Sequence, residues 1–158
     1  MKLSGSWNPK NNITLDLNGK TITVEVESDK IITAINVING ATFTLCDCKG
    51  TGSITHEQGG GTGSGVNISG GVFHMYGGSI TGNTANVGGG VYMSGGEFHM
   101  YGGSITKNTA EKDDRNNGGN GGGVCMYGGT FTMTGGTIGG TNDGEANTAT
   151  RGGGVYVT

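Results

Sequence analysis

The chain has 158 residues, of which 37 are glycine and one is proline, and its formal net charge is −3. Glycine does not recur at every third position, which excludes collagen, and charged residues make up only 13%, which argues against a disordered linker. The small net charge supplies no basic surface for nucleic acid, and no apolar run reaches the ~20 residues that a membrane-spanning helix needs.

The first third of the chain holds two similar segments whose apolar residues alternate, as in β-strands. Residues 17–24 read Leu-Asn-Gly-Lys-Thr-Ile-Thr-Val, and residues 38–45 read Ile-Asn-Gly-Ala-Thr-Phe-Thr-Leu. In both segments an Asn-Gly pair favours a tight turn before the strand. The match predicts that Ile22 and Phe43 hold the same position in successive units of a repeat.

A glycine-paired unit repeats through the rest of the chain. Residues 65–85 read GVNISGGVFHMYGGSITGNTA, and residues 90–110 read GVYMSGGEFHMYGGSITKNTA. A third copy follows and a fourth begins at residue 154. Within a copy, apolar anchors such as Val66, Phe73 and Ile80 lie seven residues apart, which predicts three short strands separated by glycine corners.

Stacking such units at ~4.8 Å brings equivalent residues into columns. We therefore predict an all-β parallel β-helix of about five triangular coils. One column would hold Phe73, Phe98 and Phe131, and a corner column would hold Asn83, Asn108 and Asn147. Residues 1–58 would form leading coils and residues 59–158 glycine-rich coils of one continuous domain, which we expect to be a fragment of a larger protein.

Two insertions interrupt corners and leave the strands intact, as solenoids tolerate. They include Glu111–Arg115 and Asn142–Glu145, which are rich in acidic and polar side chains. Neither has the residue order of a dedicated calcium loop, so we expect solvated loops.

The G-G-x-I blocks at residues 77–80 and 102–105, with a Thr-containing copy at 135–138, resemble the repeats of chlamydial polymorphic membrane proteins. They also resemble glycine-rich repeats of large surface proteins from gut bacteria. The chlamydial repeats pair this block with F-x-x-N, whereas here Ile80 and Ile105 precede the asparagine. The resemblance covers roughly residues 59–158. It implies a single-stranded, right-handed β-helix and an adhesin-like role at the cell surface or in a secreted protein.

Period-two alternation points Phe73 inward and places His74, Tyr76, His99 and Tyr101 on the surface. Exposed aromatic rings could stack against sugars or partner chains; alternatively, they only stabilise the stacked strands. The two histidines could share a metal ion, but we find no outward Cys, Asp or Glu that would complete the site. We therefore predict a ligand-binding ladder with no metal and no cofactor.

The three cysteines, Cys46, Cys48 and Cys125, are too few and too unevenly placed for a disulfide framework. Cys46 and Cys48 form a C-x-C pair in an apparent insertion, which could bind metal or form a short-loop disulfide. We favour free thiols and place Cys125 outward on a strand, while the redox state of all three stays open.

Many β-helices degrade polysaccharides, which requires placed carboxylates. On the repeat strands the acid is Glu97, with Val72 and Thr130 at the equivalent positions. A threonine row for ice binding, at residues 130–134, does not continue into the coil before it. We predict no enzyme, but a non-catalytic structural or adhesive module that contacts a host glycan or surface protein and associates end to end. The alternative is a carbohydrate-binding or polysaccharide-degrading β-helix.

Overall fold

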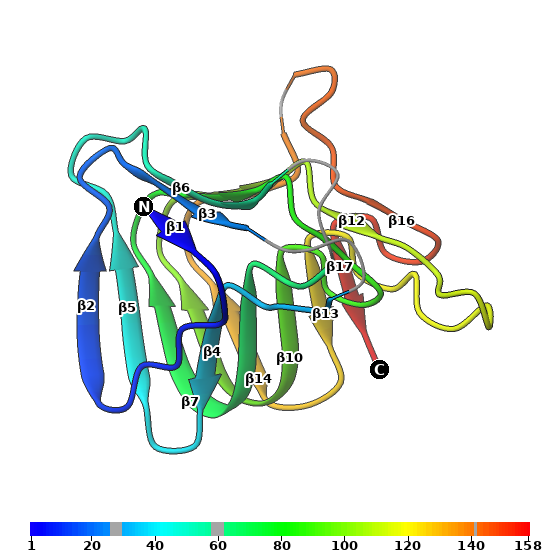
Figure 1. Cartoon of the computed structure of the whole chain (residues 1–158), viewed down its shortest axis with the longest axis horizontal. Coiled ribbons are helices and arrows are strands. Elements are labelled where there is room, and N and C mark those ends of the chain that lie inside the picture. The colour runs from blue at the N-terminus through cyan, green and yellow to red at the C-terminus, as the bar shows by residue number, and fades with distance from the viewer. Residues whose placement is uncertain (26–29, 58–61, 141) are drawn as a thin grey trace.

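The structure is a computed structural model that describes residues 1–25, 30–57, 62–140 and 142–158. The described residues form 17 β-strands and no helix, so none of them builds a helix able to cross a membrane. All pairs of named strands are parallel, and the strands are stacked in three sheets, consistent with a β-solenoid (Figure 1). The predicted boundary at residues 58–59 lies outside the described residues.

The sheets differ in size and in strand length. The long sheet contains β2 (Asn12–Asp16), β4 (Ile35–Ile38), β5 (Thr42–Cys46), β7 (Val66–Met75), β10 (Val91–Met100), β13 (Val124–Met126), β14 (Thr130–Met133) and β17 (Val155–Val157). The six-stranded sheet contains β1 (Lys2–Leu3), β3 (Thr21–Val24), β6 (Ser53–His56), β8 (Ser79–Thr81), β11 (Ser104–Thr106) and β15 (Thr137–Ile138). The third sheet contains β9 (Thr84–Ala85), β12 (Thr109–Ala110) and β16 (Thr148–Ala149).

The register of the strands confirms the predicted columns. In the repeat region they comprise Val66–Val91–Val124–Val155, Phe73–Phe98–Phe131 and Ile80–Ile105–Ile138. The phenylalanine column extends back to Phe43, and its rings stack with centroids 4.8–5.6 Å apart. Trp7 packs edge-on against Phe43 at 5.5 Å. Inward apolar positions therefore form one continuous core along the stack.

The prediction of three similar strands per coil is wrong in one respect. The glycine pairs at residues 70–71 and 95–96 lie at corners, as predicted, but β7 and β10 continue through them with a shift in register, so that two predicted strands are joined into one. The first half of β7 pairs with β4 and the second half with β5, and the chain turns between these halves (Figure 1). Gly96 has φ +87°, and a Cβ there would overlap the carbonyl oxygen of Gly71 in the neighbouring coil. The pair therefore forms a bulge at the corner. In the coils of β7 and β10 one long strand is followed by a three-residue strand and a two-residue strand, whereas in the next coil Gly128 and Gly129 separate β13 from β14.

The prediction for Ile22 is also wrong. Ile22 pairs with Ile54, which pairs with Ile80, whereas Phe43 pairs with Ile13. The two Asn-Gly turns lie at different corners, one after β2 and the other before β5, so their similarity is local. The true repeat in the leading coils is longer than the sequence match, because Ile13 and Phe43 are 30 residues apart.

The asparagine column forms as predicted and lies inside the molecule. Asn83 and Asn108 are fully buried and Asn147 nearly so. The backbone and side-chain amides of Asn83 donate to Asn108 Oδ1, and those of Asn108 donate to Asn147 Oδ1, over 2.9–3.1 Å. His56 continues this column in the preceding coil, with Nδ1 2.7 Å from Asn83 Oδ1 and Nε2 2.7 Å from the Ile32 carbonyl. The sequence hides this role because no Asn-Thr-Ala motif follows β6.

Candidate functional site

The four predicted surface residues come together on the outer face of the long sheet. His74 lies in β7 and pairs with His99 in β10, and Tyr76 and Tyr101 follow directly after these strands. The histidine rings stack with centroids 5.1 Å apart and the tyrosine rings at 4.6 Å. Tyr76 is 55% exposed and Tyr101 41%. We call these four side chains the aromatic ridge.

The stacking decides which surfaces of the ridge a ligand can reach. Tyr76 and Tyr101 are inclined by only 18°, so each ring covers one face of the other. A ligand can therefore reach only the outer faces of the two rings and their hydroxyl edges. Thr44 and Thr132 occupy the histidine column on either side, so the rings stand beside smaller side chains. The ridge therefore offers two lateral aromatic walls and two phenol hydroxyls, and not the broad flat platform that unstacked rings would give.

Glu97 has a partner on its own strand, although the equivalent positions in the neighbouring coils hold no partner for it. Its Oε2 lies 2.8 Å from Nε2 of His99, two residues along the same strand and therefore on the same face. Burial, and then the neighbouring His99, lower the pKa of His74, which is therefore neutral at pH 7. His74 Nδ1 is buried and has no hydrogen-bond partner. The alternation of side chains along β10 could have indicated the Glu97–His99 pair.

The cysteines are free thiols in different surroundings. Burial raises the pKa of Cys46, and the side chain of Asp16 raises that of Cys48. Cys125 corrects a prediction: it keeps the outward register beside Tyr92 but is fully buried, because the corner at Gly121 packs closely against it. Burial raises the pKa of Cys125 as well. In the described part of the chain, no three His, Cys, Asp or Glu side chains are grouped to hold a metal ion.

The acidic loops use carboxylates to hold their own turns. Asp113 accepts backbone N–H bonds from Arg115 and Asn117 at 2.8–3.0 Å. Glu145 accepts bonds from the backbone and side-chain nitrogens of Asn142, both at 3.1 Å. Most side chains of both loops are exposed, which fits the expectation of solvated loops.

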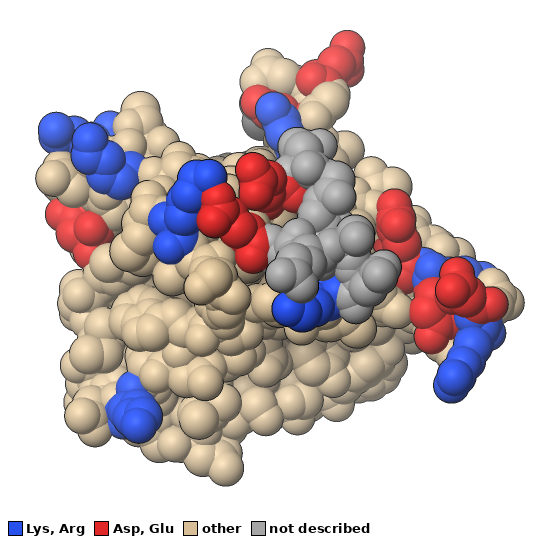
Figure 2. All heavy atoms as spheres, in the orientation of Figure 1, with Lys and Arg blue, Asp and Glu red and all other residues tan. Residues whose placement is uncertain are grey.

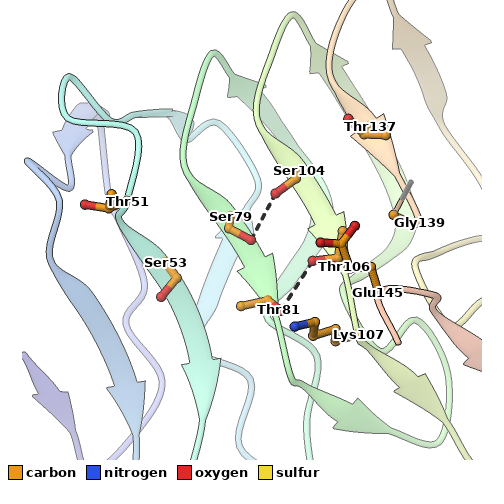
Figure 3. A pocket seen from close by; sticks show the side chains of 11 residues that line it. Thr51, Ser53, Ser79, Thr81, Ser104, Thr106, Lys107, Thr137, Gly139 and Glu145 are labelled. Carbon is orange, nitrogen blue, oxygen red and sulfur yellow. Dashed lines mark hydrogen bonds between the residues drawn. The ribbon is translucent and has the colours of Figure 1, made fainter. Parts of the chain in front are cut away.

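A second feature, which the sequence analysis missed, is a polar trough of about 420 Å³ on the outer face of the six-stranded sheet (Figure 3). We call it the hydroxyl trough. It is lined by Thr51, Ser53, Ser79, Thr81, Ser104, Thr106, Lys107, Thr137, Gly139, Gly140 and Glu145. The recurring Ser/Thr-Ile-Thr triplet, with isoleucine inward, could have indicated it, because period-two alternation turns both hydroxyls outward.

Comparison of the chain with protein-family models, with curated proteins and with solved structures finds no match. The stacked columns position both the ridge and the trough on the surface of the molecule.

Proposed function

We propose that this chain is a non-catalytic structural and adhesive module, a right-handed, single-stranded parallel β-helix of about five triangular coils in a bacterial cell-surface or secreted protein. The three parallel sheets and the columns of equivalent residues are evidence for the β-helix. The resemblance of the glycine-rich repeats to bacterial surface proteins supports the handedness and the location. The proposed partner is a host glycan or surface protein, and end-to-end association of copies is a further part of the proposal.

The exposed aromatic ridge is the observation that carries the adhesive role. A buried tyrosine covers roughly 150–250 Å², so two half-exposed rings leave roughly 200 Å² for a partner. At ~25 cal/mol per Å², covering this area contributes at most about 5 kcal/mol. That corresponds to a dissociation constant of about 0.2 mM before ordering costs. One module would therefore bind weakly, and many copies displayed together would bind well.

The surroundings of Glu97 support the absence of catalysis. Hydrolysis of a glycosidic bond normally requires two placed carboxylates. The residues paired with Glu97 on either side are Val72 and Thr130, and its own oxygen is bonded to His99. In the view of Figure 2, charged side chains gather along the upper edge and the loops, and the lower region carries little charge.

A glycan array and a panel of host surface proteins, probed with the module on multivalent beads, test the proposal. We expect binding that disappears when Tyr76 and Tyr101 are both changed to Ser. The matched control is Tyr127→Ser, because Tyr127 is also 41% exposed but packs against Tyr92 away from the ridge. The absence of binding to any probe would reduce the module to a passive stalk. Release of shortened or unsaturated sugars from a polysaccharide would contradict the non-catalytic role.

A further inference from the structure

We infer that the hydroxyl trough is a second binding site, which takes a linear neutral polysaccharide lying across the strands, along the direction in which the coils stack. The trough lies on a different sheet from the aromatic ridge and shares no residue with it. Its floor is formed by β6, β8, β11 and β15, one strand from each successive coil (Figure 3). Four strands at ~4.8 Å give a floor roughly 14 Å long.

The hydroxyls of the floor form two parallel rows. Ser104 Oγ donates to Ser79 Oγ at 3.0 Å, and Thr106 Oγ1 donates to Thr81 Oγ1 at 3.4 Å. The rows are two residues apart along each strand, or ~6.6 Å. The first row has one hydroxyl in each of four coils (Ser53, Ser79, Ser104 and Thr137), and the second has Thr81 and Thr106, with Gly139 at the same position in the last coil. A linear sugar polymer likewise carries hydroxyls along both edges at a regular spacing. The match in periodicity favours a chain that crosses several coils over a compact ligand that sits on one.

The hydrogen-bonding capacity of the rows indicates a neutral ligand. Each Ser or Thr hydroxyl has one donor and two acceptor lone pairs. Ser104 and Thr106 donate within the rows, whereas Ser79 and Thr81 accept and keep their own protons, so the floor offers both donors and acceptors. Sugar hydroxyls both donate and accept and can use both kinds of group. An anion only accepts, so the acceptor lone pairs of the rows would stay unused.

Two charged residues at one side of the trough agree with this conclusion. Glu145 contributes a carboxylate that its own loop holds through Asn142, and Lys107 contributes an ammonium group, so the two charges offset one another. Lys107 has φ +56°, at the corner where the preceding coil has Gly82 with φ +67°. A lysine in this left-handed conformation costs about 1 kcal/mol relative to glycine. At the rim, its Nζ is placed to donate to a hydroxyl of the inferred polysaccharide.

Calorimetric titration of the whole chain with cello- and xylo-oligosaccharides of two to six sugars tests the inference, with oligogalacturonides as the acidic comparison. We expect the affinity for one neutral series to rise with length and then level off once the ~14 Å floor is covered. Replacing Thr81 and Thr106 by Val preserves shape and removes one hydroxyl from each of two coils. This change should weaken binding about tenfold, at 0.5–1.5 kcal/mol per lost bond.

Lys107→Gly provides a second variant that does not threaten the fold, because glycine already occupies the equivalent corner at residue 82. It should also weaken binding while leaving thermal stability unchanged or higher. Retained affinity in both variants, tighter binding of oligogalacturonides, or no binding of any neutral oligosaccharide would overturn the inference. The Tyr76/Tyr101 double variant should bind these oligosaccharides normally, so failure of the trough and failure of the ridge can be told apart.

Discussion

Changing Asn108 to Ala should destabilise the protein strongly, because Asn108 lies in the middle of the buried asparagine column. Its side chain makes four hydrogen bonds: Oδ1 accepts from the backbone and side-chain nitrogens of Asn83, and Nδ2 donates to the Ile80 carbonyl and to Asn147 Oδ1, all at 2.9–3.1 Å. At about 1 kcal/mol per net bond the loss is about 4 kcal/mol. Urea unfolding followed by circular dichroism should show a midpoint lower by about 2 M, for a slope of about 2 kcal/mol per M.

The matched control is Asn36→Ala. Asn36 also bridges neighbouring coils, donating to Asn8 at 2.9 Å and accepting from Asn67 at 3.3 Å, but it lies on the outer face and is only partly buried. Water can replace its partners, so its loss should cost less than about 1 kcal/mol. If Asn108→Ala costs no more than Asn36→Ala, the buried amide column does not hold the coils together as described.

Three further measurements test other parts of the structure. Gly96→Ala should cost about 3 kcal/mol in urea unfolding because its Cβ would overlap the Gly71 carbonyl, whereas Gly139→Ala, with the same φ of +87° but open space, should cost about 1 kcal/mol; equal costs would remove the close approach from the explanation. Asp16→Asn should lower the pKa of Cys48 and speed its alkylation at pH 8, since the Asp16 side chain raises that pKa, and an unchanged rate would refute this coupling. Backbone N–H bonds, that of Asn117 first, lower the pKa of Asp113 below its ordinary 3.8; its stabilising contribution is therefore present above pH 3.8 and lost as the pH falls through the lower folded-state value. Thermal unfolding midpoints between pH 2 and 6 should fall less steeply in Asp113→Asn, and identical slopes would count against this role.

The columns of the repeat region could be predicted from the sequence because two copies are nearly identical and their apolar residues alternate. Register follows directly when equivalent residues such as Phe73 and Phe98 are spaced by one whole coil. The leading coils lack such copies. There two Asn-Gly turns resemble each other only locally. Their similarity predicts the phenylalanine column for Ile22, which in fact pairs with Ile54.

The role of each glycine pair depends on neighbours that the sequence does not place. The repeat pattern predicts a corner at Gly96, but it does not show that a Cβ there would overlap the carbonyl oxygen of Gly71 in the adjacent coil. The burial of Cys125 also depends on a neighbouring segment. The alternation of side chains along β13 directs Cys125 outward, but the corner at Gly121 covers it. The aromatic ridge could be predicted because its residues occupy equivalent positions in two neighbouring copies of the repeat. To predict the trough, one would have to know that the Ser-Ile-Thr strands of three coils and Thr137-Ile138 of the next share one face.

The most direct test of the proposal that this chain presents repeated binding surfaces and does not act by catalysis is one time course. The polysaccharide that the module binds best is incubated with the wild-type protein, and the bound fraction and the polymer length are measured in the same samples. We predict saturable binding with no change in polymer length or reducing ends over hours. Progressive shortening of the polymer, or release of unsaturated sugars in proportion to the protein added, would contradict the claim.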